Sequence, residues 1–367
     1  MTKTFENAKA IGYADLLEKI KAANLTEYGL CPAPLADNIY AACAKEGDAY
    51  VHAGLNNADV DGALLGLLKA DPDAVFSGIA VAGLLTGAAA KFMYLPAGET
   101  ELAAELKAKA EEYKIIIVND IINVRESEGD LLIHFATAKD LADLVDGKYE
   151  PGHYVVLEGE APKKVAPDTK VSELVSLDGA KAVYLGYQYY TPEEAAALTA
   201  SAATNGVIRV LTDKDCIVAE TAKILLKDRA ASCGRCVFCR EGLIQLEFMQ
   251  KEITQARGKA NYADLTREIG EAMCYNTLCT VGEESAKIAL TAFAKFGDEF
   301  EAHIKKNKCP ADCIEGKAKF IHMIDEFECT KCGKCIEACE EDAVVLTSGK
   351  LPKLPSRLTK VGKFKKH

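Results

Sequence analysis

Closely spaced cysteines are the first sign of chemistry in this 367-residue sequence. Cys233, Cys236 and Cys239 form a Cys-x2-Cys-x2-Cys run, and Cys279 follows after 39 intervening residues. Thiolates are soft ligands that suit iron–sulfur clusters, and each of the four irons of a [4Fe–4S] cluster needs one terminal ligand. A structural zinc ion also takes four cysteines, but two Cys-x2-Cys pairs usually hold it. The spacing therefore favours a [4Fe–4S] cluster.

A second cysteine run lies nearer the C-terminal end and has the Cys-x2-Cys-x2-Cys-x3-Cys spacing of bacterial ferredoxins. Its members are Cys329, Cys332, Cys335 and Cys339. Glu340 replaces the proline that usually follows the last cysteine, and the motif has no second copy. We expect a second [4Fe–4S] cluster here. A lone motif either closes on itself or borrows a ligand, for which Cys309 or Cys313 is available.

A third set combines histidine and cysteine. His303, Cys309 and Cys313 form a His-x5-Cys-x3-Cys pattern with a spacing that suits zinc. Ligation of an iron–sulfur cluster and free thiols remain alternatives. The candidates for a fourth zinc ligand are Cys274, His322 and Cys216. Because free cysteine is readily buried, Cys31, Cys43 and Cys216 are otherwise expected to be packed core thiols.

Composition limits the classes of protein. Eleven of the 14 cysteines lie beyond residue 230, which indicates metal chemistry in a reducing compartment and not a disulfide scaffold. The net charge of −11 and the lack of an aromatic-basic motif argue against nucleic-acid binding. The N-terminus has no apolar signal region, and the longest apolar run, residues 78–90, is too short to span a bilayer. We expect a cytoplasmic chain without direct membrane insertion.

The expected helices and strands divide residues 1–305 into three regions. Residues 1–150 read as α/β, with Ile115–Val118 as a buried strand of a parallel sheet. No glycine-rich phosphate loop occurs in this region. Residues 151–215 contain short strands separated by Gly and Pro, and residues 216–305 are helical around the first cysteine run.

Several motifs resemble a known family. Ser232–Gly242, with 39 residues between Cys239 and Cys279, resembles the flavin-carrying NADH-binding subunit of respiratory complex I and its relatives in NAD-linked hydrogenases and formate dehydrogenases. Phe296–Ile304 is close to the family's Phe-Arg-Asp-Glu-Phe-Glu-Ala-His-Ile, and Asp71–Gly78 is similar to its Asp-Pro-His-Lys-Leu-Ile-Glu-Gly. The ferredoxin-like extension resembles the hydrogenase and electron-bifurcating branch. In related hydrogenase subunits a stretch equivalent to the third set suggests a structural zinc.

This resemblance implies an α/β fold class with added modules. The expected parts are a degenerate Rossmann-like flavin- and NADH-binding-like domain (1–150), a β-grasp module similar to the soluble-ligand-binding domain (151–215), a helical bundle with a [4Fe–4S] cluster (216–305), a ferredoxin-like segment (306–348) and a basic tail (349–367). The tail, with two prolines, is either a strap on an acidic partner surface or a solvated terminus.

The N-terminal half departs from the family where its cofactors bind. The family holds FMN with Gly-Arg-Gly-Gly-Ala-Gly-Phe-Pro-Thr-Gly, whereas Gly29–Asn38 stands here without the loop glycines. Ala53–Val60 stands at the position of the family's Asn-Ala-Asp-Glu-Ser-Glu-Pro-Gly, and the position of its Gly-Glu-Glu-Thr falls near His134–Lys139. We therefore predict that FMN and NAD are absent.

The leading hypothesis is a non-catalytic electron-transfer subunit of a multisubunit cytoplasmic oxidoreductase. It would relay electrons through two [4Fe–4S] clusters, with a candidate structural zinc, and its expected partners are the other subunits and a ferredoxin. One alternative is a divergent FMN-dependent NAD(P)H dehydrogenase subunit of a hydrogenase, formate dehydrogenase or bifurcating complex. A second alternative is a structural scaffold subunit.

Overall fold

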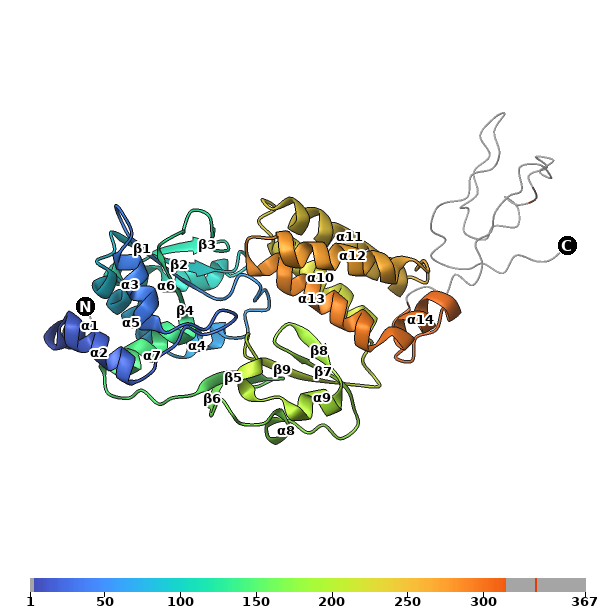
Figure 1. The fold of residues 1–367 in the computed structure, drawn as a ribbon, viewed down its shortest axis with the longest axis horizontal. Coiled ribbons are helices and arrows are strands. Elements are labelled where there is room, and N and C mark those ends of the chain that lie inside the picture. Colours follow the sequence, from blue (N-terminus) through green and yellow to red (C-terminus); the bar gives the residue numbers. More distant parts are fainter. Residues whose placement is uncertain (1–2, 315–333, 335–367) are drawn as a thin grey trace, which may run out of the picture.

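The computed structural model describes residues 3–314 and Lys334, which form three regions packed side by side (Figure 1). An N-terminal α/β region holds a parallel sheet, a second region holds a mixed sheet, and a third is helical. The second cysteine run, His322 and the basic tail lie outside the described residues.

The N-terminal sheet is entirely parallel, with the strand order β3-β2-β1-β4. Its strands are β1 (Tyr50–Gly54), β2 (Ala90–Leu95), β3 (Ile116–Asn119) and β4 (Leu131–His134). Its helices are α1 (Lys3–Ile11), α2 (Tyr13–Ala22), α3 (Leu35–Cys43), α4 (Leu65–Ala70), α5 (Pro72–Thr86), α6 (Thr100–Tyr113) and α7 (Phe135–Val145). The prediction of a buried strand at Ile115–Val118 was wrong in one respect. This strand, β3, lies at the sheet edge, where Ile116 is 51% exposed.

Helix α5 explains the Asp71–Gly78 motif in physical terms. The Asp71 carboxylate accepts a hydrogen bond from the Ala74 N–H, and Pro72 occupies the first helical position, where a missing N–H costs nothing. A side chain at Gly78 would collide with the Ala138 carbonyl, so glycine permits the close crossing of α5 and α7. Since α5 is apolar on nearly all sides, it is buried at the centre of this region.

The second region is a five-stranded mixed sheet with the order β6-β5-β9-β7-β8. Strands β5 and β9 are parallel, and the other neighbours are antiparallel. Its elements are β5 (His153–Leu157), β6 (Lys163–Val165), α8 (Val171–Leu174), β7 (Ala180–Leu185), β8 (Gln188–Tyr190), α9 (Pro192–Ala197), the 3-10 helix η1 (Ala200–Ala202) and β9 (Val207–Thr212). It has its own small core, which includes Val155, Val183 and Ile208. The assignment as a β-grasp module stays a prediction.

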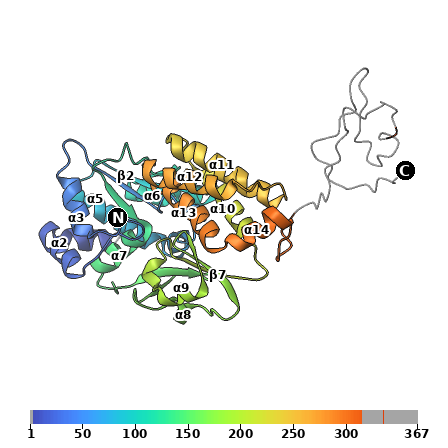
Figure 2. The same cartoon turned by 45° about the vertical axis from the view of Figure 1, so that its right-hand side comes forward.

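The third region is helical and begins directly after β9. Its helices are α10 (Ile217–Ala231), α11 (Val237–Thr254), α12 (Tyr262–Asn276), α13 (Thr280–Lys295) and α14 (Gly297–Lys306). The Phe293 and Phe300 rings stack at 3.8 Å between centroids, and Gly242 lets α11 approach Met273 of α12. Figure 2 shows α14 at the end of this region that faces away from the N-terminal sheet. Among the described helices, none has the length and apolarity needed to cross a bilayer.

Candidate functional site

The first cysteine run occupies the turn between α10 and α11. Helix α10 ends at Ala231 with Ser232 as its C-cap, and Cys236 is the residue that precedes the first turn of α11. Gly234 has φ +69°, a left-handed conformation that glycine adopts without strain. The Arg240 Nη1 donates to the Gly234 carbonyl at 3.0 Å, and the Gly234 N–H donates to the Ser232 hydroxyl at 3.3 Å. The turn therefore fixes three cysteines at one helix start.

Cys279 comes to this place from a different segment. It precedes the first turn of α13, as Cys236 precedes that of α11, so two of the four thiols lie at helix N-termini, where the helix dipole favours a thiolate. Burial first, and then the neighbouring thiols of Cys279, Cys236 and Cys233, raise the pKa of Cys239. Burial and the thiols of Cys233 and Cys236 likewise raise the pKa of Cys279. The four thiols thus act on one another as close neighbours, and we call them the cluster thiols.

The chemistry of the cluster thiols fits a group that brings positive charge. Four neighbouring thiolates repel one another, so they hold their protons unless iron or another cation neutralises them. Their exposure is graded, because Cys239 is buried, Cys236 and Cys279 are half-buried and Cys233 is exposed. The four cluster thiols therefore extend from the helical core to the protein surface.

The third set forms a much tighter group at the other end of α10. The ligand atoms of Cys216, His303, Cys309 and Cys313 all lie within 4.8 Å of one another, and we call these residues the metal set. The His303 Nε2 lies 3.2 Å from the Cys313 Sγ and 3.5 Å from the Cys216 Sγ, and the two sulfurs are 3.2 Å apart. Tetrahedral zinc holds its ligand atoms about 3.5–4 Å apart. These distances suit a single ion.

The surroundings orient the metal set. The His303 Nδ1 lies 2.7 Å from the Glu299 carbonyl oxygen, which requires a proton on Nδ1 and leaves the Nε2 lone pair for a metal. The Glu299 carboxylate accepts from the Ile217 N–H at 2.9 Å and pairs with Lys181 at 3.0 Å, which ties α14 to the start of α10. Sequence reasoning missed Glu299, although it lies one helical turn before His303.

Protonation at the metal set depends on the same contacts. The hydrogen bond with the Cys313 thiol, followed by burial, raises the pKa of Cys216. Burial opposes the charged form of His303, but hydrogen bonds with Cys216 and the Glu299 carbonyl outweigh it and raise the pKa of His303. A bound divalent ion would reverse this preference, because metal binding requires deprotonated ligands.

Of the candidates for the fourth ligand that lie within the described residues, Cys216 and Cys274, the structure brings Cys216 next to His303, Cys309 and Cys313. The Cys274 Sγ instead lies 3.9 Å from the Glu283 carbonyl oxygen. The expectation of packed core thiols was wrong for Cys31 and Cys43, which are exposed. Cys43 is the last residue of α3, where the helix meets solvent.

Comparison with known proteins assigns the helical region. The family profile described as NADH-ubiquinone oxidoreductase-F iron-sulfur binding region matches residues 221–303, the segment that contains all four cluster thiols. This segment is similar to the iron–sulfur region of those proteins, and we refer to it as the oxidoreductase-F iron–sulfur region. Part of the chain is therefore similar in sequence to proteins that carry this region.

Curated relatives and solved structures agree with this placement. The chain is 29% identical over 140 residues to the NADP-reducing hydrogenase subunit HndC of Solidesulfovibrio fructosivorans, covering 38% of this chain and 28% of that one. It is 30% identical over 105 residues to the NADH-quinone oxidoreductase F 2 protein of Rhizobium meliloti, covering 29% of this chain and 25% of that one. The matches thus span about a quarter of the relatives' length.

The fold is similar to a chain of a NAD+-reducing [NiFe]-hydrogenase in its H2-reduced state. The TM-score is 0.69 at 18% sequence identity, and the match covers 83% of this chain and 64% of that chain. The likeness therefore extends over the fold well beyond the oxidoreductase-F iron–sulfur region.

The residues around Gly29–Asn38, the segment compared above with the family's flavin loop, are held by their own backbone hydrogen bonds. The Glu27 N–H donates to the Ala33 carbonyl at 2.8 Å, and the Leu35 N–H donates to the Leu25 carbonyl at 2.9 Å. Pro34 precedes α3, and Asp37 lies in the first turn of that helix. Because Pro34 has no N–H and Asp37 repels anions, this helix start is a poor phosphate site.

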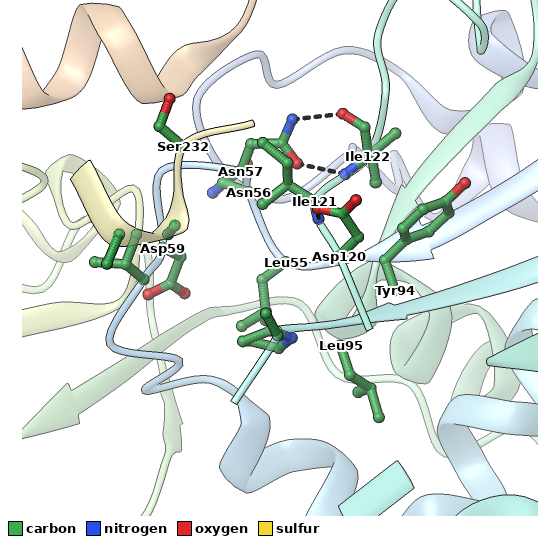
Figure 3. A pocket seen from close by; sticks show the side chains of 15 residues that line it. Leu55, Asn56, Asn57, Asp59, Tyr94, Leu95, Asp120, Ile121, Ile122 and Ser232 are labelled. Atoms are coloured by element: carbon green, nitrogen blue, oxygen red, sulfur yellow. Dashed lines mark hydrogen bonds between the residues drawn. The ribbon is translucent and has the colours of Figure 1, made fainter. Parts of the chain in front are cut away.

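In the segment Ala53–Val60, the Asn57 side chain forms hydrogen bonds within the chain (Figure 3). The Asn57 Nδ2 donates to the Ile122 carbonyl at 2.8 Å, and the Ile122 N–H donates to the Asn57 Oδ1 at 2.9 Å. These residues line a cavity of about 170 Å³ that also contacts Asp59 and Ser232. Both the donor Nδ2 and the acceptor Oδ1 of the Asn57 amide thus form hydrogen bonds within the chain.

The segment His134–Lys139 follows the same pattern. The His134 Nδ1 accepts from the Ala136 N–H at 3.0 Å and caps α7, while the Thr137 Oγ1 accepts from the Tyr28 N–H at 2.9 Å. In these segments the Asn57 amide, the His134 Nδ1 and the Thr137 Oγ1 bind the chain itself, whereas the Asp59 Oδ2 and the His134 Nε2 have no hydrogen-bond partner among the described residues.

Proposed function

We propose that this chain is an electron-carrying subunit of a multisubunit oxidoreductase. The single observation that carries the proposal is the gathering of four thiols, from two distant segments, inside the oxidoreductase-F iron–sulfur region. Cys233, Cys236, Cys239 and Cys279 would hold a [4Fe–4S] cluster, which supplies one-electron transfer when bound. The exposure of Cys233 leaves one side of this site open to a partner.

The chain's own residues prepare this site. The two helix starts at Cys236 and Cys279 favour thiolates, and the Gly234 turn, held by Arg240, orients the run. A second [4Fe–4S] cluster on Cys329, Cys332, Cys335 and Cys339 belongs to the same proposal, and those residues lie outside the described part of the chain. The expected partners are the other subunits of the complex and a ferredoxin.

We further propose that the metal set holds structural zinc and that FMN and NAD are not bound. The zinc proposal is supported by three sulfurs and one imidazole nitrogen within 4.8 Å. The proposed absence of FMN and NAD is supported by the backbone hydrogen bonds of the loop before α3 and by the hydrogen bonds that the Asn57 amide and the His134 Nδ1 form within the chain.

The test is anaerobic purification of the full chain with measurement of iron, acid-labile sulfide, zinc and released flavin. We expect about eight irons and one zinc per chain and no flavin. Iron content near zero after anaerobic reconstitution would contradict electron transfer. A cluster that no reductant or partner subunit reduces in stopped-flow absorbance would instead support the scaffold alternative.

The dehydrogenase alternative keeps one supporting observation. A cavity of about 370 Å³, within the usual range for ligand pockets, lies between the parallel sheet and Cys279. Stoichiometric FMN in the purified chain, with NADH-dependent bleaching of the flavin, would establish this alternative in place of the flavin-free subunit.

A further inference from the structure

Exposed apolar side chains are concentrated around the cluster thiols. Among the described residues, half of the exposed large hydrophobic side chains lie between residues 237 and 278. They are Val237, Phe238, Ile244, Phe248, Tyr275 and Leu278, with exposed fractions from 42% to 86%. A single exposed apolar side chain is ordinary, whereas a concentrated group marks an interaction site. We call this group the apolar face.

Three members of the apolar face form a stripe along α11. Val237, Ile244 and Phe248 are seven and four residues apart, a spacing that puts them on one side of the helix. At 1.5 Å per residue the stripe is about 16 Å long. It begins beside the cluster thiols, because Val237 directly follows Cys236. The stripe therefore leads from the cluster thiols along the surface of the helical region.

Tyr275 and Leu278 extend the apolar face on the other side of the cluster thiols. They lie at the end of α12 and in the turn that leads to Cys279. Gly242 of α11 lets Met273 of α12 approach closely, so the start of α11 and the end of α12 lie at the same end of the helical region. Tyr275 is 86% exposed, and tyrosine is enriched among the residues that contribute most to binding.

An acidic border accompanies the apolar face. Glu268 and Glu271 precede Tyr275 by seven and four residues, so they share its side of α12. Both are exposed, and neither forms an ion pair within the part of the chain that the structure describes. Asp264, one turn earlier, pairs with Arg267 at 3.0 Å. The border thus presents two carboxylates that a cationic segment can neutralise.

The chain itself supplies a segment whose chemistry suits this surface. The described residues of the helical region end at Ile314, next to Cys313 of the metal set, and 53 residues follow in the sequence. Residues 315–348 contain the second cysteine run, and residues 350–367 carry seven cations and no anion. A stretch of 34 residues is too short to bury a sufficient core alone, so a surface to pack against would stabilise it.

The connection is long enough to reach the apolar face. About 22 Å of α10 separates the metal set from the cluster thiols. Fifteen residue steps lead from Ile314 to Cys329, and an extended chain of this length spans up to about 50 Å. Because the segment is tethered, its binding is intramolecular, and the effective concentration is in the millimolar range. Individually weak contacts therefore suffice.

We propose that residues 315–367 of this chain bind the apolar face, with the second cysteine run against the stripe on α11 and the basic tail along the acidic border of α12. This contact covers the exposed aromatic side chains and brings the two cysteine runs next to one another. It deepens the proposed function, on which it rests only for the consequence that the two proposed clusters exchange electrons directly.

The test is photo-crosslinking in the full, iron-loaded chain. The photoreactive residue p-benzoylphenylalanine replaces Phe248, and a mixture of isotope-labelled and unlabelled chains separates crosslinks within one chain from crosslinks between two copies. We expect crosslinks to residues 315–367 of the same chain. The same probe in place of Leu84, which is 40% exposed on α5, is the control and should give none. Crosslinks between two copies, or none to residues 315–367, would overturn the proposal.

Electron paramagnetic resonance separates a failure of docking from a failure of the proposed function. In the fully reduced chain, two neighbouring clusters broaden each other's signals by spin coupling. Ile244→Glu places a charge in the stripe and should remove this broadening while the iron and zinc contents stay unchanged. Two uncoupled signals in the unaltered chain would refute docking and leave the proposed function intact. Iron content near zero would contradict the proposed function, and crosslinking would still decide docking.

Matched charge variants test the acidic border. The double variant Glu268→Gln and Glu271→Gln should lower the crosslink yield roughly threefold at low salt and little at high salt, because exposed ion pairs are weak and screened. The control, Glu101→Gln with Glu105→Gln, removes the same charge from α6 and should leave the yield unchanged. Equal losses in both double variants would refute the acidic border as the binding site of the basic tail.

Discussion

The cluster thiols and the metal set lie at opposite ends of α10 and differ in how tightly they are gathered. Cys216 precedes α10 and Cys233 follows it, so about 22 Å of helix separates the two sites. The metal set is the one group of at least three such ligands, among the described residues, whose ligand atoms all lie within 4.8 Å. The cluster thiols are also mutual neighbours, but they are more widely spread and partly exposed.

The distances between ligand atoms can distinguish a site for one ion from a site for a cluster. A single zinc bonds every ligand itself, so its ligands must converge on one point. In a [4Fe–4S] cluster each thiolate binds a different iron, so the thiolates stand around a larger body. The tight set therefore suits one ion, and the open set suits a cluster.

The largest expected effect is at the cluster thiols. Cys236→Ser should remove about four irons per chain and the visible absorbance that belongs to this cluster, because one iron loses its ligand. The variant should also unfold more easily, since the cluster joins the α10–α11 turn to the start of α13. Cys43→Ser, which alters an exposed thiol outside both sites, is the control and should keep all metals. Unchanged iron in Cys236→Ser would remove Cys236 from the ligand set.

Loss of the metal set should have the next largest effect. Cys313→Ser should abolish binding of about one zinc per chain, leave the iron content unchanged and lower the thermal midpoint by several degrees. In domains of 150–250 residues, each kcal/mol lost from the free energy of unfolding lowers the thermal midpoint by about 2–4 °C. Metal analysis and anaerobic calorimetric scanning measure both quantities. Cys274→Ser is the matched control, because this thiol contacts Glu283 and not the metal set. Parallel loss of iron and zinc would mean that the two sites are not independent.

A smaller effect concerns the buried acid near the cluster thiols. The folded pKa of Glu27 is about 8, whereas an unfolded glutamate has a pKa of about 4.3, so the folded state binds the additional proton between these values. Its contribution to stability is complete below about pH 4 and declines as the pH rises towards 8. Glu27→Gln should therefore flatten the loss of unfolding free energy between pH 5.5 and 8.5. Each pKa unit corresponds to about 1.4 kcal/mol.

Denaturant unfolding of both proteins across this range measures the difference. Burial raises the pKa values of Asp59 and Asp228 to about 7. Both residues remain in the variant, so they still make the free energy of unfolding fall with pH in this range. Parallel curves for the two proteins would show that Glu27 is ionised in the folded state.

The smallest expected effect is electrostatic. Arg240→Gln removes a positive charge beside the cluster thiols and should lower the cluster's reduction potential. An exposed charge stabilises the reduced form of a neighbouring cluster by about 0.5–1 kcal/mol, which corresponds to a shift of roughly 20–40 mV in a one-electron potential. Arg257→Gln, just beyond the far end of α11, should leave the potential unchanged. Equal shifts in both variants would indicate a general change in net charge, which a redox titration at higher salt would suppress.

The spacing of the cysteines predicted which side chains would lie near one another, because residues close in sequence share one turn. Whether they hold a cluster and a zinc ion stays a prediction. Cys216 could not be chosen over Cys274 from the sequence, since it meets His303 only after 87 residues of chain have folded. Likewise, Ile115–Val118 has the composition of a buried strand, but its place at the sheet edge depends on strand order. The pairing of Asn57 with Ile122 joins two loops that have no shared pattern.

The order of ligands along the chain has a consequence for biosynthesis. The cluster thiols, between Cys233 and Cys279, are enclosed in sequence by the metal set, which begins at Cys216 and closes at Cys313. A ribosome that has just translated α13 has therefore made every cluster thiol, while three of the four metal-set ligands are still to be synthesised. The proposed cluster ligands are thus all synthesised before the proposed zinc ligands are complete, so the first of these sites can assemble before the second.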